Sequence, residues 1–293
     1  MSDSIASLRH SIASATELQS VVRTMKAMAA SSIGQYEHAV RSLDTYYDTV
    51  QLGLRACLAQ QPLTHYTAAM PQRANAAIGV IVFGSDQGLV GQFNEAMVDF
   101  VAKKLASLPG EKVVWSVGER LRSRLAEVQL LPLADFLLPG SINAITALVG
   151  QILLEVDTQR EQGKIGKVYV FHHRPKSGSI YAAVSQQLLP LDYGWQRGLF
   201  SKKWPTAMLP EVLYSKERTL KALVREFLFV SLYRACAESL ASENASRLAA
   251  MQRAEKNIDE LEAQLKQTFH RLRQSDIDEE LFDVLSGFEA LRD

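Results

Sequence analysis

Cysteine is nearly absent from this chain of 293 residues, in which Cys57 and Cys236 are the only two. A disulfide framework and a zinc knuckle both need several closely spaced ligands, so this spacing argues against either. An excess of charge of one sign is also lacking, since Lys and Arg total 32 and Asp and Glu total 32. Without a strong positive field we expect no nucleic-acid partner.

Long apolar runs are missing as well. The most apolar stretches, such as residues 76–84, fall far short of the roughly 18 residues that a membrane-spanning helix needs. The first ten residues include Asp3 and no continuous apolar region, unlike a secretory signal. We therefore expect a chain that does not cross the membrane and lies on its cytoplasmic side.

Proline is absent from both ends of the chain. The first proline is Pro62, and none follows Pro210. Before Pro62 only Gly34 and Gly53 could interrupt a helix. The sequence therefore predicts one helix over residues 1–60 and another over residues 211–293, with lengths of roughly 80 Å and roughly 110 Å.

Both predicted helices carry a stripe of apolar or small residues about every 3.5 positions, which is the repeat of a coiled coil. The first stripe contains Ile5, Leu8, Ile12, Ala15, Leu18, Val22, Met25, Ala29, Ile33, Tyr36, Val40, Leu43, Tyr47, Val50, Leu54 and Cys57. The second contains Ala237, Leu240, Asn244, Leu248, Met251, Ala254, Ile258, Leu261, Leu265, Phe269 and Leu272. We expect the two helices to form an antiparallel coiled coil, in which Asn244 could set the register.

The second helix is predicted to be longer than the first, so that roughly 20 residues from about Ser275 onward have no partner within the chain. This tip is nevertheless apolar, with Ile277, Leu281, Phe282, Val284, Leu285, Phe288 and Leu291. An exposed apolar helix is ordinarily covered by another protein.

The segment between the helices has a different periodicity. Short β-branched runs predict strands, and amphipathic patterns between them predict helices. The strands are expected over 77–83, 112–117, 167–171 and 180–184, and the helices over 94–107, 119–128 and 142–162. This alternation predicts a Rossmann-like α/β domain over residues 75–192, and residues 193–210 read as an irregular connection.

Residues 84–94, GSDQGLVGQFN, are the most suggestive local motif, because a glycine-rich turn between a strand and a helix can bind phosphate. The motif matches neither GxGxxG nor GxxxxGK[ST] and lacks a lysine. The alternative interpretation is a tight turn that caps the following helix. A nucleotide-dependent enzyme therefore stays open as a second hypothesis.

Other polar residues carry weaker signals. His172 and His173 could bind a metal, but no acidic or cysteine ligands are placed to complete the site, and a solvated pair at a strand end is the simpler expectation. Glu238, Glu243 and Glu255 are expected on a solvated helix face. The basic residues of the two long helices are also solvated surface by default, but they could meet a partner if the helices lie inside one; they include Arg23, Lys26, Arg271 and Arg273.

Four segments, in order along nearly the whole chain, resemble the gamma subunit family of F-type ATP synthases. RTMKAMAASS at 23–32 is similar to KAMEMVAASK, and SDQGLVGQFN at 85–94 is similar to SDRGLCGGFN. LYRACAESLASENASRLAAMQRAEKN at 232–257 resembles LYxxLxESxASExxARMxAMxxAxxN. FHRLRQSDIDEELFDVLSGFEAL at 269–291 resembles YNKARQAxITxEITEIVSGAEAL.

The resemblance implies a central rotor shaft that couples proton or sodium flow to ATP synthesis or hydrolysis and has no catalytic site or cofactor of its own. It implies alpha, beta and epsilon subunits and a membrane c-ring as partners, at the cytoplasmic face of the membrane. The residues it suggests for partner contact are Arg23, Met25, Lys26, Arg273, Gln274, Phe282, Leu285 and Phe288.

The chain also departs from the family pattern, at Ser32, Gln87, Val90, Asn244, Leu248, His270 and Asp278. These departures favour a divergent member, such as the subunit of an alternate copy of the enzyme. A static coiled-coil scaffold is a further alternative, but it does not explain the α/β insertion.

Overall fold

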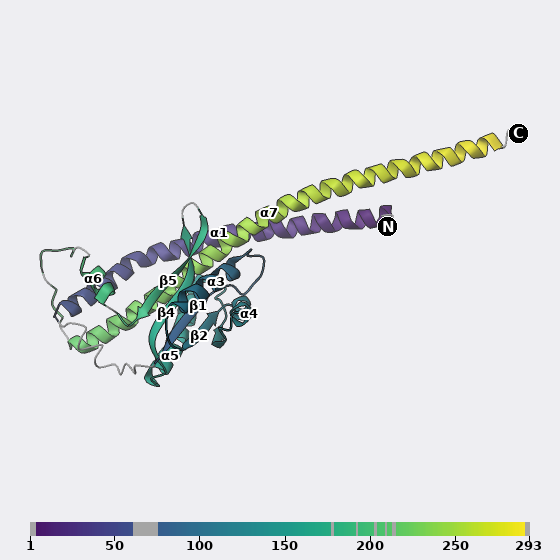
Figure 1. Ribbon diagram of the computed structural model, residues 1–293. Coiled ribbons are helices and arrows are strands. Elements are labelled where there is room, and N and C mark those ends of the chain that lie inside the picture. Colours follow the sequence, from purple (N-terminus) through teal and green to yellow (C-terminus); the bar gives the residue numbers. More distant parts are fainter. Residues whose placement is uncertain are drawn as a thin grey trace. The chain divides into compact units, whose positions relative to one another are not determined.

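The computed structural model describes residues 4–60, 76–176, 179–191, 193–201, 204–208, 210–212 and 215–290 (Figure 1). The chain forms two compact units. One combines Met1–Ala29 with Leu248–Asp293, and the other is Ala30–Arg247. The two long terminal helices, α1 (Ile5–Gln60) and α7 (Lys216–Ala290), each contribute to both units.

The pair of long terminal helices is confirmed, with 56 residues in α1 and 75 in α7. Helix α1 begins after Ser4, whose Oγ accepts a hydrogen bond from the Ser7 backbone N–H at 3.2 Å. This side chain satisfies one of the free N–H groups of the first turn.

In the first unit, α1 and α7 pair in antiparallel directions with a constant register. Each step forward along α1 is matched by an equal step backward along α7. The contacts join Arg9 to Phe269, Thr16 to Glu262, Gln19 to Asp259 and Arg23 to Glu255. Extending this register to Ile5 reaches Arg273, so residues 274–290 of α7 lie beyond the start of α1, as Figure 1 shows at the ends marked N and C.

The phase of the predicted stripes is wrong at two places. Leu18 and Leu261, both expected in the seam, are 57% and 50% exposed. The partly buried neighbours at these points are Gln19 and Glu262, which hydrogen-bond across the helix pair. Seam residues that do become buried in this unit are Leu8, Ala15, Val22, Ala29 and Met251.

Asn244 was expected to set the register of the helix pair, but its hydrogen bonds do not support this role. Its side-chain N–H donates to the Leu240 carbonyl at 2.8 Å, and its side-chain oxygen accepts from Arg247 at 3.2 Å. Both partners belong to α7 itself, so these bonds do not select a pairing with α1.

The second unit contains a five-stranded sheet with strand order β3-β2-β1-β4-β5. The strands are β1 (Ala77–Phe83), β2 (Lys112–Val117), β3 (Pro132–Phe136), β4 (Ile165–Lys176) and β5 (Ser179–Leu189). Only the β4–β5 pair is antiparallel. Every residue of β1 is buried, as expected for the central strand of a parallel sheet covered on both faces.

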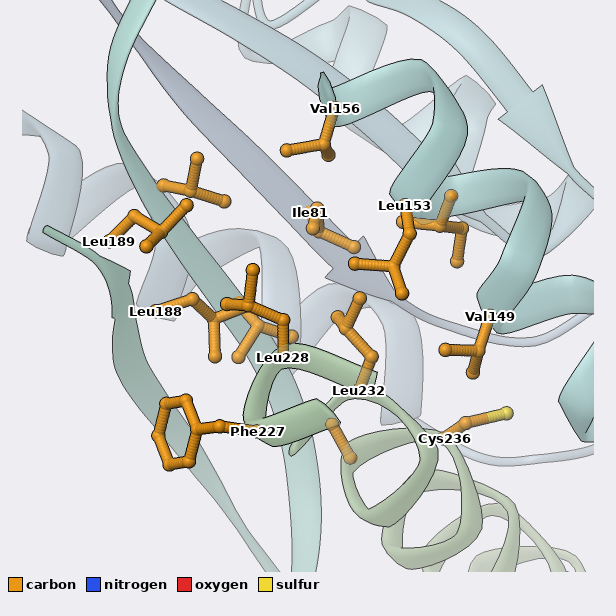
Figure 2. Close-up of a cluster of buried hydrophobic side chains, with 14 of the residues drawn as sticks. Ile81, Val149, Leu153, Val156, Leu188, Leu189, Phe227, Leu228, Leu232 and Cys236 are labelled. Carbon is orange, nitrogen blue, oxygen red and sulfur yellow. The ribbon is translucent and has the colours of Figure 1, made fainter. Parts of the chain in front are cut away.

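Alternate residues of β1 enter two separate cores. Ile78, Val80 and Val82 pack with α3 (Phe93–Ala106) and α4 (Glu119–Glu127). Ala77, Ile81 and Phe83 belong to the other core, with α5 (Ile142–Glu161), the second half of α1 and the start of α7. Figure 2 shows this second core, where Leu232 and Cys236 of α7 lie near Val149 and Leu153 of α5, and Leu228 and Phe227 lie on the side of Leu188.

The α/β architecture of the inserted segment is thus confirmed, with two elements that the sequence did not indicate. Strand β3 was missed because it is short, lies at the sheet edge and begins with a proline. Helix α6 (Tyr193–Ser201) occupies part of the segment that was read as irregular. Its residue Trp195 lies 5.2 Å from Phe227 of α7, ring to ring, so tertiary packing stabilises it.

We predict that Met251→Asp separates the helices of the first unit, because Met251 is 2% exposed and a buried unpaired charge costs several kcal/mol. Leu261→Asp serves as the matched control, since Leu261 is half exposed. Amide hydrogen exchange should become faster over residues 5–29 in the first variant only. Equal acceleration in both variants would place Leu261 in the seam after all.

Candidate functional site

The glycine-rich motif at residues 84–94 joins the end of β1 to α3, where ligands bind in many open α/β sheets. A side chain at Gly84 would lie 2.5 Å from Leu121, so only glycine fits. Asn94 accepts a hydrogen bond from the Ser85 backbone N–H at 3.0 Å and donates one to the Ser85 hydroxyl at 2.8 Å. These two side chains are therefore engaged with each other.

Asp86 of the same motif holds two neighbouring strand ends. Its carboxylate accepts hydrogen bonds from the backbone N–H groups of Glu119, at 2.8 Å, and Leu138, at 2.9 Å. Glu119 opens α4, and Leu138 follows β3. The polar side chains of the motif thus brace the carboxyl edge of the sheet, which favours a structural turn over phosphate binding. The expected side-chain cap of the following helix is not found, because the residue before α3, Gln92, makes no side-chain cap hydrogen bond.

The two adjacent histidines do not form a solvated pair, which corrects the sequence-based expectation. His172 is 1% exposed and His173 is 0% exposed. Successive residues of a strand point to opposite faces, so their rings separate. The His173 Nε2–H donates to the Phe93 carbonyl of α3 at 2.9 Å, whereas His172 Nε2 lies 2.8 Å from Glu238 of α7. Within the described ranges no three His, Cys, Asp or Glu side chains are grouped to hold a metal ion.

Glu238 is the centre of a buried charge cluster, which corrects its assignment to a solvated face. The side chain is 4% exposed, and its carboxylate accepts hydrogen bonds from His172 at 2.8 Å, Arg174 at 2.7 Å and Arg234 at 2.8 Å. Burial by itself would raise the pKa of Glu238, but the bonds from His172, Arg234 and Arg174 outweigh burial and lower the pKa to about 2. The carboxylate is therefore ionised at neutral pH.

The histidines beside this cluster are neutral. Burial lowers the pKa of His172, although its bond to Glu238 opposes the shift, and burial lowers the pKa of His173 to about 4. His172 therefore donates its Nε2–H to Glu238, whose charge is balanced by the two arginines. A neutral histidine also leaves Nδ1 without a proton, which suits the buried Nδ1 of His173, an atom with no hydrogen-bond partner in the described structure.

Glu243 and Glu255 were also expected on a solvated face, and the structure departs from this expectation more for Glu243 than for Glu255. Glu243 is buried and bonds Arg247 at 2.6 Å within α7, and burial raises its pKa, with Arg247 opposing. Glu255 lies in the first unit, where it accepts from Lys26 at 2.5 Å and Arg23 at 3.1 Å. The hydrogen bonds from Lys26 and Arg23 lower its pKa.

The suggested partner-contact residues fall into two groups. Arg23 and Lys26 are bound to Glu255, and Met25 between them is half-buried. The remaining residues belong to the last part of α7. Arg273 and Gln274 are exposed, Phe282 is 71% exposed, Leu285 is 52% exposed, and the side chain of Phe288 lies outside the described residues.

The helix tip beyond the register of α1, residues 274–290, exposes several large apolar side chains in the part of it that the structure describes. Its exposed apolar side chains are Ile277, Leu281, Phe282, Val284 and Leu285. Contiguous exposed apolar side chains on one segment mark a surface for interaction with another protein. The tip therefore has the chemistry of a surface that another chain covers.

The positions where the chain departs from the family pattern lie in different surroundings. Val90 is buried, and its carbonyl accepts from Ser246 of α7 at 2.6 Å. Gln87, His270 and Asp278 are exposed, and Ser32 is half-buried.

Among the described helices, none is apolar over a stretch long enough to cross a bilayer.

An antiparallel pair of terminal helices with an α/β insertion and an uncovered apolar tip is typical of a subunit that works inside a larger assembly. A family model described as ATP synthase matches residues 4–291. The ATP synthase gamma chain of Bdellovibrio bacteriovorus is 26% identical over 301 residues, covering 99% of each chain. That of Anaeromyxobacter sp. strain K is 28% identical over 302 residues, again covering 99% of each.

Solved structures share the fold. A chain of the Euglena gracilis mitochondrial ATP synthase, in a structure of its OSCP/F1/c-ring, is 17% identical with a TM-score of 0.66, covering 98% of this chain and 94% of that one. A chain from the central stalk and c-ring of the Tetrahymena thermophila enzyme is 22% identical with a TM-score of 0.56, covering 80% and 99%. The chain therefore belongs to the ATP synthase family, and the relatives named above are gamma chains.

We predict that the free energy of unfolding falls as the pH is lowered from about 6.5 to about 4. Unfolded histidine takes up a proton near pH 6.5, whereas His173 in the folded chain does so only near 4, so protons favour the unfolded state in this window. The slope that one such histidine adds is about 1.4 kcal/mol per pH unit at most.

His173→Gln keeps a donor for the Phe93 carbonyl and should flatten this part of the pH profile, although the variant is less stable overall. Chemical denaturation at a series of pH values measures the slope. Parallel profiles for parent and variant would mean that His173 is already charged in the folded chain.

Proposed function

We propose that this chain is the central rotor shaft, the gamma subunit, of an F-type ATP synthase. The observation that carries the proposal is the tip of α7, residues 274–290, which extends beyond the register of α1 and exposes a series of large apolar side chains. Membership of the ATP synthase family supplies the identity of the assembly that would cover it.

The shaft would work by contact and not by chemistry. A rod that is asymmetric in cross-section presents a different face to each subunit of a surrounding ring, so its rotation can favour a different conformation in each catalytic site in turn. In this proposal the ring consists of alpha and beta subunits, and ion flow through a membrane c-ring, of protons or sodium ions, is coupled to ATP synthesis or hydrolysis.

In this proposal each of the three predicted segments has its own role in the rotor. The helices of residues 1–60 and 211–293 would form the shaft, and the α/β domain of residues 75–192 would form the foot that meets the epsilon subunit and the c-ring. Solved structures similar to this chain include the central stalk and c-ring of the Tetrahymena thermophila enzyme and the rotor of the Euglena gracilis enzyme. The chain would lie at the cytoplasmic face of the membrane as a peripheral subunit.

The suggested contact residues fit this arrangement to different extents. Arg273, Gln274, Phe282, Leu285 and Phe288 would face the alpha and beta subunits at the tip. Arg23, Met25 and Lys26 would lie near the moving part of a catalytic subunit, where a partner carboxylate would compete with Glu255 for Arg23 and Lys26.

A nucleotide-dependent enzyme remains the rival hypothesis, and the geometry of residues 84–94 argues against it. Ser85, Asp86 and Asn94 already hydrogen-bond within the chain. The purified chain should therefore bind no nucleotide saturably and hydrolyse no ATP. Turnover that is lost on mutation within residues 84–94 would reverse this choice.

Amide hydrogen exchange tests the shaft directly. In the free chain, residues 274–290 should exchange fast, because a helix without tertiary packing is only marginally stable. In a complex with alpha and beta subunits the same residues should be strongly protected. Equal exchange in both states would contradict the proposal that the tip lies in a sleeve of these subunits.

Replacing Phe282 and Leu285 together by Ser should weaken assembly with alpha and beta subunits by at least tenfold, because burial of each side chain contributes roughly 1.5–3 kcal/mol. The melting temperature of the free chain should be unchanged, since both side chains are exposed there. Glu280→Gln, at an exposed position of the same tip, is the matched control. Unchanged assembly of the double variant would remove the tip from the interface.

A further inference from the structure

The contact between the α/β domain and helix α7 includes only a few directional polar bonds within the described part of the second unit. On the side of β4, His172 and Arg174 donate to Glu238. Next to β1, the Val90 carbonyl accepts from the Ser246 hydroxyl at 2.6 Å. Glu238 and Ser246 are eight residues apart, which places them on one face of α7.

Strand geometry explains why β4 can reach this helix twice. His172 and Arg174 are two positions apart, so both point to the same face of the sheet, whereas His173 between them points to α3. Both side chains meet the same carboxylate oxygen of Glu238, at 2.8 Å and 2.7 Å.

The same carboxylate is also linked to α1. Its second oxygen accepts from Arg234, which is one turn earlier on α7 and forms an ion pair with Asp44 of α1 at 3.1 Å. A single buried carboxylate thus connects the sheet with both long helices in this unit.

Tyr181 of β5 also hydrogen-bonds the Ser246 side chain, and large apolar side chains make up much of the remaining sheet–helix contact. Figure 2 shows Leu228 and Leu232 of α7 among side chains of β5 and α5. Apolar burial depends on area and not on direction, so it resists separation of the two surfaces better than it resists rotation or sliding of one over the other. Hydrogen bonds with fixed geometry supply the missing resistance.

We propose that Glu238 is a positioning residue that fixes the rotation of α7 against the α/β domain, so that torque applied to that domain turns the helix without slippage. The inference rests on the proposed shaft function, because torque has to pass from the foot to the helices only in a rotor. It assigns to Glu238, His172 and Arg174 a role in coupling that is separate from folding.

The experiment compares the parent with Glu238→Gln in the assembled enzyme, in membrane vesicles. Two rates are measured on each preparation, ATP hydrolysis and ATP-driven ion uptake. Proton uptake is followed with a pH-gradient dye, and sodium uptake is measured separately. The variant should keep hydrolysis within about twofold of the parent, since the alpha and beta subunits contact the far end of α7. Ion uptake per ATP hydrolysed should fall at least threefold, because the helix turns without carrying the foot.

Glu217→Gln is the matched control, because Glu217 lies on the same helix in an exposed pair with Lys221. Its uptake per ATP should equal that of the parent. A Glu238→Gln enzyme with an unchanged ratio overturns the inference, even if its melting temperature is lower, because a purely structural carboxylate would change stability and leave the ratio intact.

Arg174→Gln is the second variant, used if Glu238→Gln does not assemble. It removes one donor from the sheet side, and Glu238 keeps its bonds to His172 and Arg234. A reduced ratio supports the inference, and a parental ratio overturns it. Failure of the parent complex to take up either ion would instead contradict the proposed function, so the two failures are distinguishable.

Discussion

The burial of α7 in the second unit is the constraint on which the rest of that unit depends. From residue 227 to residue 247 no side chain of this helix is exposed. Helix α1 and the sheet both pack against α7 here. Helix α7 therefore does not have the usual one apolar and one polar face. A charge buried here is costly unless it is paired, and Glu238 has three donors from two elements.

That constraint explains which sequence-based expectations failed. A glutamate on a long helix is normally solvated, and nothing local to Glu238 or Glu243 reveals that the helix is enclosed. The adjacent histidines failed for a related reason, since strand alternation sends one towards α7 and the other towards α3. His172, Arg174 and Phe93, which bond Glu238 and the two histidines across elements, are distant from them in sequence, and a single sequence contains no record of such contacts.

Features controlled by local chemistry were predictable. The absence of proline and the 3.5-residue repeat identified both long helices, and the β-branched run of residues 77–83 matches β1 at both ends. The phase of the seam was harder to predict from the sequence. A stripe chosen by hydrophobicity selects Leu18 and Leu261, whereas in the structure Gln19 and Glu262 are the partly buried residues, and each hydrogen-bonds a residue of the opposite helix. Of the suggested contact residues, the tip could be inferred from helix lengths alone, but the engagement of Arg23 and Lys26 by Glu255 could not.

The position of Ser4 has a consequence for how this chain could vary. The hydroxyl of Ser4 caps α1 and so sets where this helix begins. Because the register with α7 is fixed, the starting point of α1 determines how much of α7 stays uncovered. Seven residues inserted between this cap and Ile5 would lengthen α1 by about two turns, cover that much more of α7 and keep the repeat in phase. Lineages could therefore lengthen or shorten the available surface at the amino end without altering a single residue of that surface.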